Sequence, residues 1–184
     1  MILSYDDLLN LWKKGKIKFN PDIDKSQIGE SSIDLRLSNK ISKPIKNPGV
    51  TIRPPYSIPN GIFNSKEIKE NESIKIKPGE LLLALTLEEV IMPSNLAAQV
   101  QGKSTLARYG LAVHITSPHI HPCWRGQVTL ELYNHGPNEL EFSPGEPVCQ
   151  LIFFKVSKPV RKEVAKVLSR YIGQKKPLPL PYKN

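Results

Sequence analysis

The sequence predicts a mainly β domain of the barrel, sandwich or jelly-roll type, with a short helix at each end. Three observations predict this class. The middle of the chain consists of short segments rich in β-forming residues, Pro-Gly or Gly-Pro dipeptides separate several of these segments, and apolar residues recur at helical spacing near the two ends. The predicted strands are 73–77, 81–87, 97–101, 111–116, 127–133, 139–142 and 148–156.

The chain begins and ends with helix signals. Ser4 and Asp7 have the spacing of a capping box, residues 8–12 supply an apolar stripe, and Gly15 is placed to end the helix. Near the other end, apolar residues recur at helical spacing over 160–171. We therefore predict a second short helix there, before a proline-rich tail.

The segment between the first helix and the first predicted strand lacks a regular pattern. The apolar residues of 31–53 come in short runs, and residues 46–64 hold four prolines and two glycines, which break regular structure. We predict that this stretch is a loop or a sheet edge.

Composition indicates one domain that spans residues 1–184, because this length with 39% apolar residues suits a single core. No apolar run approaches the roughly 20 residues that span a bilayer, and the N-terminus is acidic where a signal peptide would be basic and apolar. We expect a cytoplasmic protein. Cys123 and Cys149 are too few and too far apart for a disulfide framework or a Cys-x-x-Cys motif. The formal charge of +9 favours phosphate-bearing partners without choosing among them.

The segment Gly102-Lys103-Ser104-Thr105 looks like the end of a phosphate-binding P-loop. A P-loop needs a second glycine five positions earlier, where this chain has Ala97, and a parallel βαβ context that is missing here. We reject that interpretation. A turn with one cation and two hydroxyls, followed by Arg108, can still bind phosphate by charge and hydrogen bonds.

Glu131 lies on a predicted strand where Val128 and Leu130 alternate with Thr129 and Glu131, so one face is apolar and the other polar. A strand glutamate most often lies on a solvated outer face. If it faces a pocket instead, burial raises its pKa toward the value that a general base needs.

Three ordered blocks make a family resemblance specific. They are Gly-Lys-Ser-Thr-Leu-Ala-Arg-Tyr-Gly-Leu at 102–111, Trp-Arg-Gly-Gln-Val-Thr-Leu-Glu-Leu-Tyr-Asn at 124–134, and Pro144-Gly145 with Cys149-Gln150-Leu151. Shorter matches lie at 1–4, 31–37 and 78–80. Over nearly its whole length, the chain resembles the dCTP deaminase family.

The resemblance implies a dUTPase-like distorted β-barrel or jelly roll and a homotrimer with active sites between subunits. It implies hydrolysis of dCTP to dUTP and ammonia in pyrimidine deoxynucleotide metabolism, which supplies the precursor of dTTP. dCTP, dUTP and dTTP are the expected small-molecule partners. Magnesium would bind through the triphosphate. We expect no zinc, because zinc deaminases need Pro-Cys-x-x-Cys and Pro122-Cys123 has no second cysteine after it. No nucleic-acid-binding module is recognised.

The resemblance also implies residue roles. Glu131 would be the general base that deprotonates the water attacking cytosine C4, Ser104 would hold that water, and Arg108 would stabilise the reacting centre. Lys103 and Thr105 would join Ser104 on the phosphates, partly across a subunit boundary. The remaining positions that would bind the nucleotide are the backbone of Ile115, Thr116 and Ser117, the side chain of Trp124, and Arg170, Tyr171 and Gln174 of a tail, residues 170–184, that closes over the triphosphate.

Two positions depart from the family pattern. The family normally has an aspartate for the deoxyribose 3′-hydroxyl where this chain has His121, and some members have an arginine at His119. The departure weakens diphosphatase chemistry, so we expect dUTP rather than dUMP as product. A neutral imidazole at these two positions can still hydrogen-bond to the nucleotide.

Three alternatives stay open from the sequence. One is a bifunctional enzyme that forms dUMP, and a second is a non-catalytic nucleotide-binding member of the same fold. The third is a cupin-like metal protein, drawn from His119 and His121 with His114 and Glu131. Among the other polar residues, we expect Asp34 and Arg36 to pair at a trimer contact and Asn134 to satisfy backbone groups at a strand end.

Overall fold

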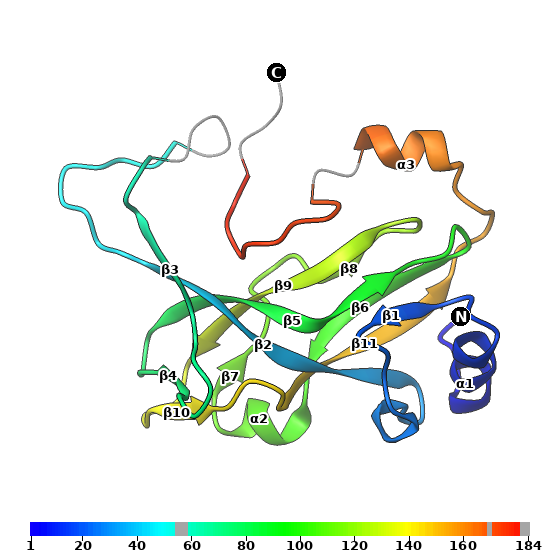
Figure 1. The fold of residues 1–184 in the computed structure, drawn as a ribbon, viewed down its shortest axis with the longest axis horizontal. Coiled ribbons are helices and arrows are strands. Elements are labelled where there is room, and N and C mark those ends of the chain that lie inside the picture. Colours follow the sequence, from blue (N-terminus) through cyan, green and yellow to red (C-terminus); the bar gives the residue numbers. More distant parts are fainter. Residues whose placement is uncertain (54–58, 169–170, 181–184) are drawn as a thin grey trace.

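The computed structural model describes residues 1–53, 59–168 and 171–180 (Figure 1). Strands dominate these residues, so the mainly β fold class is confirmed. The helices are α1 (Tyr5–Lys13), the 3₁₀ helix η1 (Lys25–Gln27), α2 (Ser104–Arg108) and α3 (Lys162–Leu168). The strands are β1 (Lys18–Asn20), β2 (Ser32–Pro44), β3 (Phe63–Glu67), β4 (Ile74–Ile76), β5 (Leu81–Ile91), β6 (Leu96–Gly102), β7 (Leu111–Ala112), β8 (His119–Ile120), β9 (Arg125–Asn134), β10 (Leu140–Phe142) and β11 (Pro147–Lys155).

One antiparallel sheet forms the body of the protein. Its main path runs β7-β9-β5-β2-β11-β6-β8, while β1 pairs with β5, β3 pairs with β2, and β4 and β10 make a separate pair. The sheet curls into a half-barrel, and the C-terminal segment lies along its upper side in Figure 1. The curl brings β8, at one end of the path, and β9, the second strand from the other end, to the same side of the molecule.

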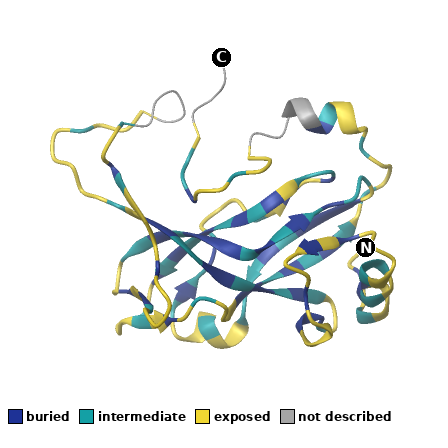
Figure 2. Ribbon diagram, viewed as in Figure 1, coloured by how far each residue is buried: buried dark blue, intermediate teal, exposed yellow. Residues whose placement is uncertain are grey.

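The core lies inside this curl. Buried residues follow the central strands, while the long loop, the turns and the outer faces of the helices are exposed (Figure 2). Along β9, Val128, Leu130 and Leu132 are buried and alternate with half-buried polar side chains. That alternation leaves Gln127, Thr129 and Glu131 together on the opposite face, because successive side chains of a strand point to opposite sides.

The two terminal helices form where the sequence predicts them, with different lengths. The Ser4 hydroxyl accepts the Asp7 N–H in a capping box, so α1 begins where predicted. The segment predicted as a second helix, 160–171, begins its helix only at Lys162. Tyr171 lies in a turn, and residues 169–170 are outside the described part of the chain.

Three elements differ from the sequence-based prediction. The stretch taken as loop or edge contains β2, a long strand in the middle of the sheet between β5 and β11. The predicted strand 111–116 ends at Ala112, because the chain turns there. The Ile115 N–H donates to the Glu131 carboxylate and not to a backbone carbonyl of a neighbouring strand. The Gly102–Thr105 turn continues directly into the short helix α2.

A bulge in β5 contains a buried carboxylate. The register between β5 and β9 shifts between Leu85 and Glu89, and inside this shift the Glu88 side chain is fully buried. Arg36 donates to Glu88 from its backbone N–H at 2.9 Å and from Nε at 2.6 Å. Gln27 adds a third donor at 3.2 Å, so the carboxylate is satisfied by polar partners.

Within the described chain, Asp34 and Arg36 do not pair with each other, and their pairing at a trimer contact stays a prediction. Asp34 instead forms an ion pair with Lys103. Asp34 and Arg36 lie on the same face of β2, two positions apart. Arg36 meets Glu88 of the neighbouring strand β5, and Asp34 meets Lys103, which directly precedes α2. Asn134 does satisfy backbone groups, since its Nδ2 donates to Ile76 O and Asn138 O. Among the described residues, no helix is long and apolar enough to cross a membrane.

Candidate functional site

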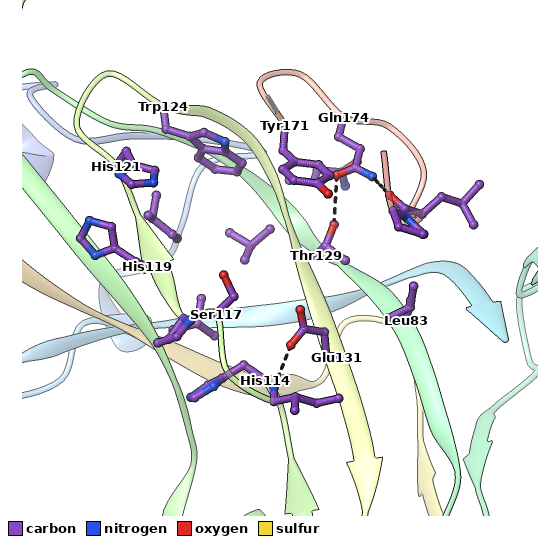
Figure 3. Close-up of a pocket in the computed structure, with 18 of the residues that line it drawn as sticks. Leu83, His114, Ser117, His119, His121, Trp124, Thr129, Glu131, Tyr171 and Gln174 are labelled. Carbon is purple, nitrogen blue, oxygen red and sulfur yellow. Dashed lines mark hydrogen bonds between the residues drawn. The ribbon is translucent and has the colours of Figure 1, made fainter. Parts of the chain in front are cut away.

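A cavity of about 690 Å³ opens on the polar face of β9. Its walls come from β8 and β9, from the turn before β8, and from the C-terminal segment, with β3, β5 and β6 at its margins (Figure 3). The lining residues are Phe63, Leu81, Leu83, Val100, His114, Ile115, Ser117, Pro118, His119, Ile120, His121, Trp124, Gln127, Val128, Thr129, Glu131, Tyr171, Gln174, Leu178 and Pro179.

Glu131 lies on the cavity wall in one fixed orientation. Its side chain is half-buried, and Oε2 accepts the backbone N–H of Ile115 at 2.8 Å (Figure 3). Its own backbone N–H donates to Val113 O at 3.0 Å, which ties β9 to the turn that carries Ile115. The carboxylate is therefore held by the adjacent turn, with its second oxygen free of protein donors among the described residues.

Two imidazoles form another part of the wall. The rings of His119 and His121 lie edge to face with centroids 4.6 Å apart, near Trp124 (Figure 3). Burial lowers the pKa of His119 below its ordinary value, and the charge of His121 lowers it further. His119 is consequently neutral at neutral pH, where an imidazole offers one donor and one acceptor.

The residues proposed for a cupin-like site all line this cavity, namely His114, His119, His121 and Glu131. Within the described part of the chain, however, no three His, Cys, Asp or Glu side chains converge in a way that would hold a metal ion.

The C-terminal segment covers one side of the cavity. The Gly173 N–H donates to Arg125 O at 2.9 Å, and Thr129 Oγ1 donates to Gln174 Oε1 at 3.4 Å. Gln174 Nε2 donates in turn to Leu178 O within the segment. Tyr171 and Gln174 therefore lie at the cavity, whereas Arg170 lies outside the described residues.

The sequence-predicted site residues fall into two groups in space. Most of them line the cavity: Glu131, Ile115, Ser117, His119, His121, Trp124, Tyr171 and Gln174. Thr116 is exposed in the same turn without lining it. A second group lies on or next to α2, at the opposite edge of the molecule from the C-terminal segment in Figure 1, and none of it lines the cavity: Lys103, Ser104, Thr105 and Arg108.

Sequence reasoning missed several residues of the wall. Gln127 and Thr129 share the face of Glu131, and the alternation along the strand was the signal that could have found them. His114, which the sequence analysis named only as a ligand of a cupin-like site, also lines the cavity, and its Nδ1 is buried without a hydrogen-bond partner among the described residues. No sequence signal identifies the apolar contributions of Leu178 and Pro179 from the tail.

Cys123, in the turn between the imidazoles and β9, has a strained backbone. Its φ is +63°, which favours glycine, and its thiol makes only a long contact of 3.8 Å with Val160 O. We expect Cys123→Gly to raise the free energy of unfolding by about 1 kcal/mol, because removing Cβ relieves that strain. Denaturant unfolding measures the change. Cys123→Ala is the matched control, since it removes the thiol and keeps Cβ, and an equal gain from both variants would contradict the backbone explanation.

Comparison of the sequence with known proteins identifies a family and several relatives. The family model described as dCTP deaminase-like matches residues 2–156. The chain is 34% identical to a dCTP deaminase of Rhodospirillum rubrum, over 97% of this chain and 95% of that protein. It is 36% identical to a protein of Dictyoglomus thermophilum named dCTP deaminase, dUMP-forming, over 96% of this chain and 92% of that one.

A solved structure shares the fold. The crystal structure of 2′-deoxycytidine 5′-triphosphate deaminase from Agrobacterium tumefaciens superposes with a TM-score of 0.65 at 16% sequence identity. The match covers 91% of this chain and 51% of that chain, so this chain spans about half the length of the solved protein. At this identity the likeness concerns the fold alone.

Proposed function

This chain belongs to the dCTP deaminase-like family, and from that premise we propose that it catalyses the hydrolytic deamination of dCTP to dUTP and ammonia. The observation that carries the proposal is the Glu131 carboxylate, which one backbone N–H holds on the wall of a cavity of about 690 Å³. A cavity of that size suits a nucleotide.

Glu131 is the catalytic residue in this proposal. It takes one proton from a water molecule as the water oxygen attacks cytosine C4, and it gives this proton to the ring nitrogen N3. It then takes the second proton from the new C4 hydroxyl and gives it to the departing amino group. The C4–O bond forms, the C4–N4 bond breaks, and the sum is dCTP and water giving dUTP and ammonia. One carboxylate that accepts and returns protons can serve each of these steps.

The rest of the cavity wall suits the nucleotide. Backbone groups of residues 115–117 lie beside Glu131, where they can bind the edge of the base. Trp124 offers an aromatic face to the ligand. Tyr171 and Gln174 are placed to close over the phosphates from the tail.

The residues expected to bind phosphate on α2 can contribute to a site only if that site belongs to a second subunit. Ser104, Thr105 and Arg108 are exposed and lie away from their own chain's cavity, so we propose a homotrimer in which α2 of one subunit completes the site of its neighbour. In this arrangement Arg108 and Ser104 reach the reacting centre, and Lys103 and Thr105 reach the phosphates.

Mixing two inactive variants tests the shared site. Co-expressed Glu131→Gln and Arg108→Ala chains are expected to regain activity, because about a quarter of the sites in random trimers combine an intact Glu131 with an intact Arg108. The measurement is ammonia release by the mixture and by each variant alone. If each site were built from one chain, every site would carry a defect and the mixture would stay inactive.

A magnesium-bound triphosphate is the proposed form of the substrate, since Mg²⁺ prefers phosphate oxygens and retained waters. We expect EDTA to stop ammonia release and added Mg²⁺ to restore it, while 1,10-phenanthroline, which removes zinc, leaves the rate unchanged. A loss with phenanthroline that zinc restores would contradict the metal-free deamination step. Deamination by a known zinc-dependent cytidine deaminase, assayed in parallel, is the positive control for the chelator.

Formation of dUMP is the second candidate, because the Dictyoglomus relative carries the name dUMP-forming. Release of diphosphate needs a group that orients a water against the α-phosphate, and the resemblance gives this role to the aspartate that the family has at the position of His121. This chain has the exposed imidazole of His121 at that position, on the cavity wall, so we propose dUTP as product.

The deciding experiment incubates the protein with dCTP and Mg²⁺, follows ammonia, and identifies the nucleotide by chromatography. Ammonia with dUTP supports the proposal, and ammonia with dUMP and pyrophosphate supports the second candidate. Binding of dCTP without any ammonia would identify a non-catalytic nucleotide-binding protein and overturn the enzyme assignment.

A further inference from the structure

The β5 bulge fixes the amide of Gln127, a cavity residue with no role so far. Gln127 Nε2 donates to the carbonyl oxygens of Thr86 at 2.8 Å and Leu87 at 3.3 Å. These carbonyls belong to the bulged stretch where the ladder between β5 and β9 is interrupted. The bulge is closed on its other side by Thr86 Oγ1, which accepts the Val128 N–H at 2.9 Å and donates to Glu88 O at 2.8 Å.

This arrangement leaves one functional group of Gln127 for a ligand. The amide nitrogen has two hydrogens, and two carbonyl oxygens accept them. The amide cannot turn over without placing its oxygen against both carbonyls. Its Oε1 is left as a hydrogen-bond acceptor on the cavity wall, and no group among the described residues donates to it.

The donors of the substrate are few. In dCTP, only the N4 amino group and the 3′-hydroxyl can donate, because the ring atoms N3 and O2 and the ionised phosphates are acceptors. The amino group must lie at Glu131, where it departs. Gln127 lies on the same face of β9 four residues away, about 13 Å at Cα, so the two side chains can reach opposite ends of one nucleoside.

We propose that Gln127 Oε1 accepts a hydrogen bond from the 3′-hydroxyl of the substrate and that Gln127 is a specificity-determining residue of this chain. The inference rests on the proposed function, which sets dCTP in the cavity. An acceptor at this point repels a phosphate and selects a sugar that carries a hydroxyl. His121, which lines the same cavity, is the competing contact for that hydroxyl.

A cycle of protein and substrate changes isolates this contact. The protein changes are Gln127→Met, which has a similar length and no amide, and Gln127→Lys, which keeps a donor for the bulge carbonyls and has no acceptor. The substrate change is dCTP to 2′,3′-dideoxycytidine triphosphate, which lacks the 3′-hydroxyl. His121→Asn is run as the comparison variant, and thermal unfolding checks that each variant folds.

For the parent, we expect loss of the 3′-hydroxyl to lower kcat/KM about tenfold, the size of one well-placed hydrogen bond. In both Gln127 variants the same change of substrate is expected to lower kcat/KM less than about twofold, because the partner is already gone. If Gln127→Met fails to fold, Gln127→Lys alone decides. The proposal is overturned if the Gln127 variants still lose kcat/KM tenfold when the 3′-hydroxyl is removed. It is also overturned if this loss disappears only in His121→Asn.

Failure of the proposed function is distinguishable from failure of this inference. A parent protein that releases no ammonia from dCTP refutes deamination. In that case, the Kd of each protein is measured for dCTP and for the dideoxy nucleotide. Loss of the 3′-hydroxyl is expected to raise Kd about tenfold in the parent and less than about twofold in the Gln127 variants. A parent that binds the two nucleotides equally overturns the role of Gln127.

Discussion

Replacing Glu131 by Gln is expected to lower the rate of ammonia release from dCTP by a factor of about 10³, because general acid–base catalysis contributes on the order of 10² to 10⁴. An amide has the shape of the carboxylate and can still accept the Ile115 N–H through its oxygen. It cannot take a proton from water. The variant should therefore fold and bind dCTP with nearly the parent's affinity, and the loss should appear in kcat rather than in KM.

A matched control separates the lost base from a lost charge. Glu163 is an exposed carboxylate in the first turn of α3, outside the cavity and away from α2, and Glu163→Gln removes the same charge without touching the site. Ammonia release by this variant should equal that of the parent. Substantial activity in Glu131→Gln would show that another group serves as the base and would refute the mechanism.

Removing Arg36 should be the most damaging single change to stability. We expect Arg36→Ala to lower the free energy of unfolding by about 3–5 kcal/mol, because it leaves the charge of Glu88 buried without its cationic partner. The Glu88 side chain is 0% exposed, so water cannot replace the guanidinium. Denaturant unfolding, followed by tryptophan fluorescence, measures the loss.

Two further variants test that explanation. Arg125 pairs with Glu89 at the surface, where its side chain is 63% exposed, and Arg125→Ala should cost less than about 1 kcal/mol. The double change Arg36→Met with Glu88→Leu should regain most of the stability, because it removes the buried charge as well as its partner. Equal losses from Arg36→Ala and Arg125→Ala would contradict the role of burial.

The sequence predicted the strands that have one apolar face and clear turn signals at their ends. β9 is the best example, since Val128, Leu130 and Leu132 mark its buried side. The prediction was wrong for β2, because the apolar residues of 31–53 come in short runs and indicated a loop or a sheet edge. Two charged residues of this strand, Asp34 and Arg36, are paired with opposite charges. Their partners, Lys103 and Glu88, are 69 and 52 residues away in sequence, and only the folded sheet brings them together.

The candidate site was predictable where a motif carries it. The block around Glu131 resembled a known family, and the cavity lies on that block. Gln127 belongs to the same block and was still missed, because its role depends on a bulge in a different strand. The sequence also did not predict that the residues on α2 lie away from the cavity of their own chain. The spacing of residues along a chain does not show which side chains face a given cavity.

The β5 bulge has a consequence for anyone who wishes to redesign this protein. The bulge carries the Glu88 carboxylate, which binds Arg36 and Gln27 in the core. Its Thr86 and Leu87 carbonyls hold the Gln127 amide at the cavity. Stability and substrate choice therefore share a single backbone irregularity. Mutations that straighten β5 to gain stability would loosen substrate selection, and libraries aimed at new nucleotides should vary Gln127 together with Thr86 rather than alone.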